Sequence, residues 1–395
     1  MSIKPITIAV AALVLILQWP TYKYERADEK LGEFYSQIAS ANFTAARESI
    51  EEAIRLWPSN ARYYTWRAYL TSQQLPSQCL RQSKSTGDNR SMSSLDLQSS
   101  REAVADYRHA LELNRRDAVA HHNLAWLEHL LGDNTHAADD WKQSTEIDPD
   151  NAVFHLSYGM LLEESGDTQA GREQYETAIE LAPSILDSQF FIRYHSRYPA
   201  AADAIVAHCT TKMESRLQQG DDPILEARLG KLYLYSGSVK RATQLLEDAA
   251  RQLPNLPLVW FNLGESQQLQ GNNVQAMTYY KRANVIDASL ARTYLRMGEI
   301  SLHSGDRNDA IRDLNVALQR WQHMNPITAA HNNRLYGGPR QTIDDLLPTT
   351  LVWYVSPCEA SESWRALSQL FPQKSEYAKR VRACEELPAP HADLE

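Results

Sequence analysis

The fold is decided by the stretch Pro223–Gln322, which contains three segments of one design: PILEARLGKLYLYSGSVKRATQLLEDAARQLPNL (residues 223–256), PLVWFNLGESQQLQGNNVQAMTYYKRANVIDASL (257–290) and ARTYLRMGEISLHSGDRNDAIRDLNVALQRWQ (291–322). Four columns of small residues recur at an interval of 34 residues. The columns are Gly230, Gly264, Gly298; Gly237, Gly271, Gly305; Ala242, Ala276, Ala310; and Ala249, Ala283, Ala317. A shared period of this size predicts an array of helical hairpins.

The columns stand at positions 8, 15, 20 and 27 of each unit, counted from Pro223. Small residues at positions 8, 20 and 27 let two helix backbones approach closely, and large residues such as Tyr280 fill the space between them. Glycine at position 15 predicts a positive φ that ends the first helix. Each unit therefore reads as helix A, a tight turn and helix B.

This pattern closely resembles the tetratricopeptide repeat. The resemblance implies an all-α, right-handed superhelical solenoid with a groove, because a single hairpin cannot bury its apolar face alone. About eight units follow from the register, and the fifth is degenerate, with Tyr198-Pro199 breaking its first helix. The units are expected to start at residues 27, 61, 118, 152, 186, 223, 257 and 291.

Two stretches depart from the register. Gln73–Leu97 is a Ser- and Gln-rich insert in the second unit, which predicts either a contact loop or a tolerated surface insertion. Residues 323–395 follow the last unit and are expected to form a helical C-terminal cap and a tail.

Residues 1–26 hold an apolar run from Ile6 to Leu17, followed by Trp19, Pro20 and Tyr22. The run is short for a membrane span, which needs about 20 residues. It has the length of a signal-peptide core, but no small-residue cleavage site follows. We expect an uncleaved anchor that crosses the cell membrane once through residues 6–19, with the body on the periplasmic side. A cleaved signal, or neither, remain the alternatives.

Composition limits the function classes. The net charge is −9, with 40 Lys and Arg against 49 Asp and Glu, which argues against a nucleic-acid partner. No phosphate loop or catalytic motif is recognisable, so we expect neither an enzyme nor a cofactor. The alternative is an enzyme, or an accessory subunit of one, with chemistry in the C-terminal segment at His331, Asp344, Asp345 or Cys358.

The histidines and cysteines are candidates for a metal site and a disulfide, respectively. His121 and His155 fall at position 4 of their units, so they are expected to pack between helices rather than bind a metal. Cys358 and Cys384 lie in one terminal segment and form either a disulfide, if the chain is exported, or two free thiols.

One constellation points to a ligand. Repeats of this family that bind a C-terminal carboxylate use Asn at position 6 of one unit and basic residues at positions 2 and 6 of the next. Here those positions hold Asn262, Arg292 and Arg296. The preceding unit departs from the pattern, because Ala227 and Lys231 replace the expected Lys and Asn. The resemblance implies that a peptide with a C-terminal carboxylate binds, and that Arg292→Glu with Arg296→Glu abolishes binding.

The groove of such arrays is lined by helix A, which gives a set of candidate peptide-binding residues. They are Asn123, Trp126, Ser157, Met160, Asn262, Glu265, Arg292, Arg296 and Glu299. The alternative for the charged members is solvated groove charge, partly paired with Glu299.

The expected function is a membrane-anchored protein-interaction scaffold that docks a peptide or a helix of a partner. Residues Ala118–Ala202 also look similar to the arrays attached to membrane-embedded O-antigen ligase and polymerase proteins. That resemblance implies a membrane-embedded envelope protein as partner and a role in surface-polysaccharide assembly.

Overall fold

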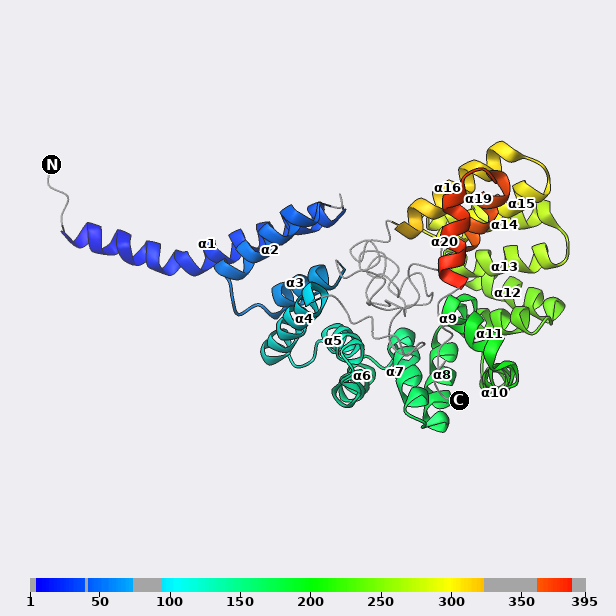
Figure 1. The fold of residues 1–395 in the computed structure, drawn as a ribbon, viewed down its shortest axis with the longest axis horizontal. Coiled ribbons are helices and arrows are strands. Elements are labelled where there is room, and N and C mark those ends of the chain that lie inside the picture. The colour runs from blue at the N-terminus through cyan, green and yellow to red at the C-terminus, as the bar shows by residue number, and fades with distance from the viewer. Residues whose placement is uncertain (1–4, 40–41, 74–93, 323–360, 386–395) are drawn as a thin grey trace. The chain divides into compact units, whose positions relative to one another are not determined.

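The computed structural model describes all residues except 1–4, 40–41, 74–93, 323–360 and 386–395 (Figure 1). The described part contains 18 α-helices, one 3-10 helix and no strand. The chain divides into two compact units, the first holding α1–α6 and the second α7–α20.

The first unit is a series of three helical hairpins. Its helices are α1 (Pro5–Ala39), α2 (Phe43–Leu56), α3 (Ala61–Gln73), α4 (Ser94–Leu113), α5 (Ala118–Leu130) and α6 (Asn134–Ile147). Each helix packs against the next one along the chain. Helix α4 begins at Ser94, inside the stretch expected to form the insert, and residues 74–93 of that stretch lie outside the described part.

The second unit continues the same architecture. Its helices are α7 (Ala152–Glu164), α8 (Thr168–Leu181), η2 (Pro183–Asp187), α9 (Gln189–Arg197), α10 (Pro199–Leu217), α11 (Pro223–Tyr235), α12 (Val239–Gln252), α13 (Pro257–Leu269), α14 (Asn273–Ile286), α15 (Ala291–His303), α16 (Arg307–Gln322), α19 (Ser361–Leu370) and α20 (Ser375–Glu385). Hairpins α11–α12, α13–α14 and α15–α16 are the three segments that define the period.

The glycines at position 15 adopt the positive φ that the pattern predicts. Five of them have φ between 75° and 90°: Gly132, Gly166, Gly237, Gly271 and Gly305. Around Gly271 the N–H of Asn272 donates to the carbonyl of Gln267 over 2.9 Å, which closes the end of α13. This left-handed cap satisfies helix carbonyls at almost no steric cost only when the residue lacks a Cβ atom.

The glycines at position 8 mark the close approach of helices A and B. A Cβ atom on Gly230 would lie 2.7 Å from Cγ of Leu246, the residue at position 24. At Gly159 it would meet the ring of Tyr175 at 2.8 Å and the backbone oxygen of Gly171 at 2.9 Å. These distances are well below van der Waals contact, so the packing of these two hairpins requires glycine here.

The fifth hairpin is irregular, as the sequence predicts. Helix α9 ends at Arg197, and α10 begins at Pro199, whose fixed φ suits a first helical position. The short helix η2 precedes α9 and packs against α8 and α11. This turn brings Asp187, the last residue of η2, beside α11.

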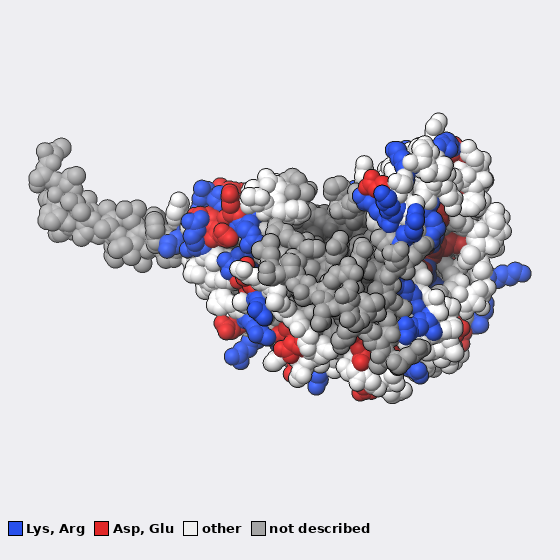
Figure 2. Space-filling view, viewed as in Figure 1, with Lys and Arg blue, Asp and Glu red and all other residues white. Residues whose placement is uncertain are grey.

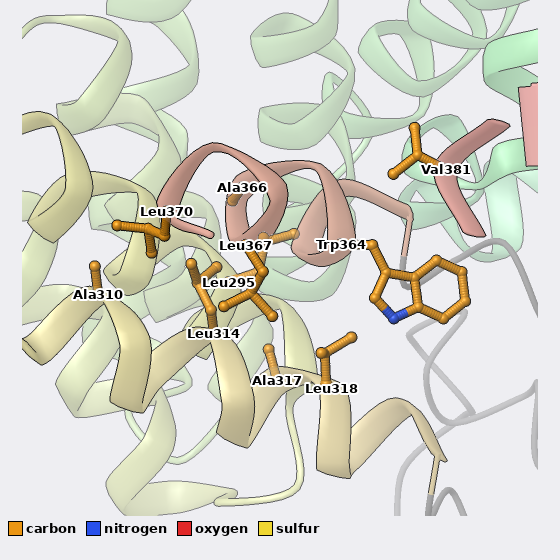
Figure 3. Packing of buried hydrophobic residues seen from close by; sticks show 10 residues of the cluster. All are labelled: Leu295, Ala310, Leu314, Ala317, Leu318, Trp364, Ala366, Leu367, Leu370 and Val381. Carbon is orange, nitrogen blue, oxygen red and sulfur yellow. The ribbon is translucent and has the colours of Figure 1, made fainter. Parts of the chain in front are cut away.

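Helix α19 packs on α15 and α16 at the end of the second unit (Figure 3). Its apolar side chains Trp364, Leu367 and Leu370 join Leu295 and Leu314 in one buried cluster. Leu367 is fully buried there. The helix therefore covers apolar surface of the last hairpin.

The apolar run of residues 6–17 lies within α1, a helix of 35 residues. Among the described helices, none combines the length and the apolar character that crossing a membrane requires. Cys209 is a buried free thiol. The expected pair Cys358 and Cys384 cannot be assigned, because Cys358 and the side chain of Cys384 lie outside the described part.

Candidate functional site

The candidate site lies on the second unit, where position 9 of consecutive repeats carries charge. Lys231 of α11, Glu265 of α13 and Glu299 of α15 occupy this column. The ammonium of Lys231 lies 2.6 Å from Oε2 of Glu265, although only 6% of the lysine side chain and 12% of the glutamate side chain are exposed. A buried lysine requires such a partner, because an unpaired charge is strongly disfavoured away from water.

Asp187 adds a second carboxylate to Lys231. Its Oδ2 atom lies 2.8 Å from Nζ of Lys231 and 3.2 Å from a guanidinium nitrogen of Arg292. Arg292 also donates a hydrogen bond to the backbone carbonyl of Asp187. The end of η2 is thus fixed to α11 and α15 by charge.

Arg296 connects Glu265 to two further carboxylates. Its guanidinium lies 3.0 Å from Glu299, 3.6 Å from Glu265 and 3.7 Å from Glu362 of α19. We call the seven residues of this cluster the charge network: Asp187, Lys231, Glu265, Arg292, Arg296, Glu299 and Glu362.

Mutual attraction keeps Asp187, Lys231 and Arg296 ionised despite burial. Burial alone would raise the pKa of Asp187, but Lys231 and Arg292 outweigh it and hold that pKa below its ordinary value. Burial would lower the pKa of Lys231, and the two carboxylates beside it raise it instead. For Arg296, too, the surrounding carboxylates outweigh burial and raise the pKa. Asp187, Lys231 and Arg296 therefore stay charged across the physiological pH range.

An open cavity of about 320 Å³ adjoins the charge network. Its wall combines charged, polar and apolar side chains from η2, α11, α13 and α15: Asp187, Lys231, Leu234, Tyr235, Glu265, Gln268, Leu269 and Arg296. Leu269 is unusual for a leucine, because 62% of its surface is exposed. The wall is thus charged and buried at Lys231 and Glu265, and apolar and exposed at Leu269, which we call the rim of the cavity.

The structure brings together only some of the residues expected to bind a peptide. Glu265, Arg292, Arg296 and Glu299 all belong to the charge network. Asn262 lies on α13 but is completely buried. Its amide has no hydrogen-bond partner among the described residues.

The remaining candidates lie on other helices and are buried. Asn123 and Trp126 are on α5, where the indole N–H of Trp126 donates to His122 over 3.1 Å. Ser157 and Met160 are on α7 and are 3% exposed each. These four side chains are buried, so they offer little surface to a ligand.

The arrangement of Arg292 and Arg296 differs from the arrangement that a carboxylate clamp needs. The two guanidinium groups lie on one face of α15, as their spacing predicts, but each is paired with protein carboxylates. Arg296 pairs with Glu299, as the alternative of solvated and partly paired groove charge expects. A peptide carboxylate would have to compete with these partners. The clamp therefore stays a prediction.

Sequence reasoning missed six of the cavity's lining residues: Asp187, Lys231, Leu234, Tyr235, Gln268 and Leu269. Lys231 entered it only as a departure from the clamp pattern. The opposite charges of Lys231 and Glu265, one repeat apart in the same column, are a signal that a reading of helix A can find. Asp187 gives no such signal, because it comes from the irregular fifth hairpin and meets Arg292 across more than a hundred residues of chain.

The histidines of position 4 take structural contacts. His155 bonds to Gln174 of α8 and to the carbonyl of Pro149, at 2.7 and 2.9 Å. His121 likewise contacts Asp140 and the carbonyl of Arg115. Within the described ranges, no group of three His, Cys, Asp or Glu side chains could hold a metal ion. His331, Asp344, Asp345 and Cys358 lie outside those ranges.

Comparison with family models identifies the type of the repeated hairpins. Two models described as tetratricopeptide repeat match the chain, one over residues 31–71 and 228–291 and the other over residues 152–185. This chain contains tetratricopeptide repeats. The tetratricopeptide fold supports a protein-interaction scaffold, and proteins built from such repeats are generally not enzymes.

Several solved structures are similar to this chain at low identity. A tetratricopeptide repeat protein from Parabacteroides merdae ATCC 43184 is 15% identical and covers 75% of this chain and 93% of its own, with a TM-score of 0.34. YrrB, described as a TPR protein with an unusual peptide-binding site, is 16% identical over 54% of this chain and 91% of its own, with a TM-score of 0.25. PilW, a type IV pilus biogenesis factor, is 19% identical over 56% and 86%, with a TM-score of 0.27. Similarity at these identities and TM-scores does not bear on function. No curated protein matches the chain.

Proposed function

We propose that this chain is a scaffold whose second unit docks a segment of a partner protein at the cavity beside the charge network. One observation carries the proposal: an open cavity of about 320 Å³ lies on helices A of consecutive repeats, with charged groups already held in place around it. Cavities of this size, with a few polar groups among apolar ones, are typical of ligand sites.

Preorganisation is the proposed basis of affinity. The ion pairs of Lys231 and Arg296 fix side chains that would otherwise be mobile, and long side chains lose about 0.5–1.5 kcal/mol each when a partner immobilises them. The conformational entropy of these wall side chains is lost when the protein folds, so binding of the partner segment does not have to supply it. A short segment can bind under these conditions.

The test is affinity capture from solubilised membranes, with the chain from Ala27 onward as bait. Leu269→Gln removes the exposed apolar rim of the cavity. Val274→Gln, at a residue that is 86% exposed and does not line the cavity, is the matched control. We expect Leu269→Gln to reduce recovery of the partner and Val274→Gln to leave it unchanged. Equal recovery with both baits would move the docking site elsewhere.

We further propose that the N-terminal segment anchors the scaffold at the cell membrane, with the repeats on the periplasmic side. Support comes from the apolar run Ile6–Leu17 and the aromatic residues that follow it. Removal of residues 1–26 should transfer the protein from the membrane fraction to the soluble fraction. A full-length chain that fractionates as soluble would contradict the anchor.

Surface-polysaccharide assembly is the pathway we propose for the partner, which would be a membrane-embedded envelope protein. The support is the similarity of Ala118–Ala202 to arrays attached to O-antigen ligases and polymerases. Loss of the gene should then change the length or amount of surface polysaccharide on a gel, and an unchanged profile would remove this assignment.

A further inference from the structure

The charge network holds more negative than positive charge. The four charged residues that line the cavity balance one another, since Asp187 and Glu265 face Lys231 and Arg296. The three residues of the network that do not line the cavity do not balance, because they comprise one cation, Arg292, and two carboxylates, Glu299 and Glu362. The network as a whole therefore has a formal charge of −1.

Two carboxylates also act on Tyr235, another residue of the cavity wall. Burial is the larger cause that raises the pKa of Tyr235 to about 12, and Asp203 and Asp187 act in the same direction. Of these causes, only the two carboxylates would stabilise a positive charge near Tyr235, because burial disfavours any charge.

The apolar part of the wall sets the shape of the ligand. Leu234, Tyr235 and Leu269 contribute apolar surface to the cavity wall, and Leu269 is the most exposed of the three, whereas Asp187 and Glu265 contribute carboxylates to the same wall. A side chain that matches both needs an apolar stem and a cationic end, which is the construction of lysine and arginine. A carboxylate has about four acceptor positions, so Asp187 can accept bonds beyond those from Lys231 and Arg292.

We infer that the cavity binds a lysine or arginine side chain of the docked partner segment, with its stem on the leucine rim and its cationic end toward Asp187 and Glu265. This inference rests on the proposed function. An incoming carboxylate would make the site more negative, or would have to displace Glu265 or Glu299 from Arg296. An incoming cation offsets the net charge of −1 of the network as a whole, and it does not compete with Glu265 or Glu299 for Arg296.

The test uses charge substitutions at Leu269, which is exposed and lies outside the charge network. Short random peptides displayed on phage are selected on the full chain, and the affinities of the selected peptides are measured for Leu269→Glu and Leu269→Lys. Both variants lose the same leucine, so their ratio isolates the effect of charge. Val274→Glu and Val274→Lys, outside the cavity, are the matched controls.

We expect selected peptides to be enriched in Lys and Arg, and to bind Leu269→Glu about tenfold more tightly than Leu269→Lys. The Val274 pair should differ by less than about twofold, because salt screens a charge placed away from the site. Acidic peptides that prefer Leu269→Lys would overturn the inference and support the carboxylate clamp. Peptides that bind both Leu269 variants as tightly as the unchanged chain would contradict the proposed docking site itself.

Discussion

Gly159 shows how a single residue fixes the geometry of a repeat. A Cβ atom here would lie 2.9 Å from the backbone oxygen of Gly171, which cannot move without shifting α8. We expect Gly159→Ala to destabilise the second unit by about 1–3 kcal/mol, as overpacking does. Hydrogen exchange of the α7 and α8 amides measures the change.

Gly32 provides the matched control for this substitution. It lies in helix α1, is exposed, and nothing within 4 Å would meet a Cβ atom. Gly32→Ala should therefore stabilise its helix by about 0.5–1 kcal/mol. If Gly159→Ala stabilised α7 in the same way, close helix approach at position 8 would not be what requires glycine.

Glu128 gives the first unit a pH dependence. Its side chain is 3% exposed and lies 2.8 Å from Arg108. Burial raises the pKa of Glu128 from 4.5 to about 7 despite that guanidinium, and Asp140 acts in the same direction as burial. Between those pH values the folded state holds a proton that the unfolded state has released.

The stability of the first unit should therefore fall as pH rises from about 4.5 to about 7. The contribution of Glu128 is complete below its unfolded pKa and is lost as pH rises through the folded one. Glu128→Gln cannot titrate, so we expect a smaller slope of unfolding free energy against pH. Glu48→Gln, at an exposed position, should retain the slope. An identical slope in wild type and Glu128→Gln would exclude this origin.

Residues that repeat could be predicted from the sequence, and residues that do not repeat could not. The packing role of Gly230 and the positive φ of Gly271 follow from columns, because each repeat imposes the same local geometry. The opposite charges of Lys231 and Glu265 also lie in a column. Asp187 joins the same cluster from an irregular turn, and only the fold brings it there.

At the scale of elements, α19 completes the last repeat. Leu367 is fully buried against α15 and α16, whereas Gln369 on the same helix is exposed. We expect Leu367→Ala to destabilise α16 by about 2–5 kcal/mol, because it leaves a cavity in the shared cluster. Gln369→Ala should change stability little. Hydrogen exchange of α16 measures both effects, and equal protection in the two variants would show that α19 does not stabilise the repeat.

The helices followed from the sequence more readily than their contacts. Period and turn glycines locate hairpins such as α13–α14, and Tyr198-Pro199 locates the break between α9 and α10. The contact of Glu362 with Arg296 could not be read from any period, because α19 lies beyond the repeats. Helix formation depends on local pattern, whereas pairing of distant helices depends on packing.

At the scale of the whole molecule, the solenoid resolves into two compact units with separate features. The first contains the helix α1 that carries the apolar run, and the second contains the charge network and its cavity. The face drawn in Figure 2 carries Lys and Arg side chains interspersed with Asp and Glu side chains. Charge on the described part of this face is thus mixed, whereas the cavity adjoins buried ion pairs.

Site-specific photo-crosslinking tests the docking site most directly. A photoreactive amino acid is placed at Leu269, on the rim of the cavity, or at Val274, which does not line it. After irradiation of intact cells, docking at the cavity predicts a crosslinked adduct with one partner from position 269 and none from position 274. An adduct of equal yield from both positions, or from position 274 alone, would contradict the proposal that the second unit docks its partner at this cavity.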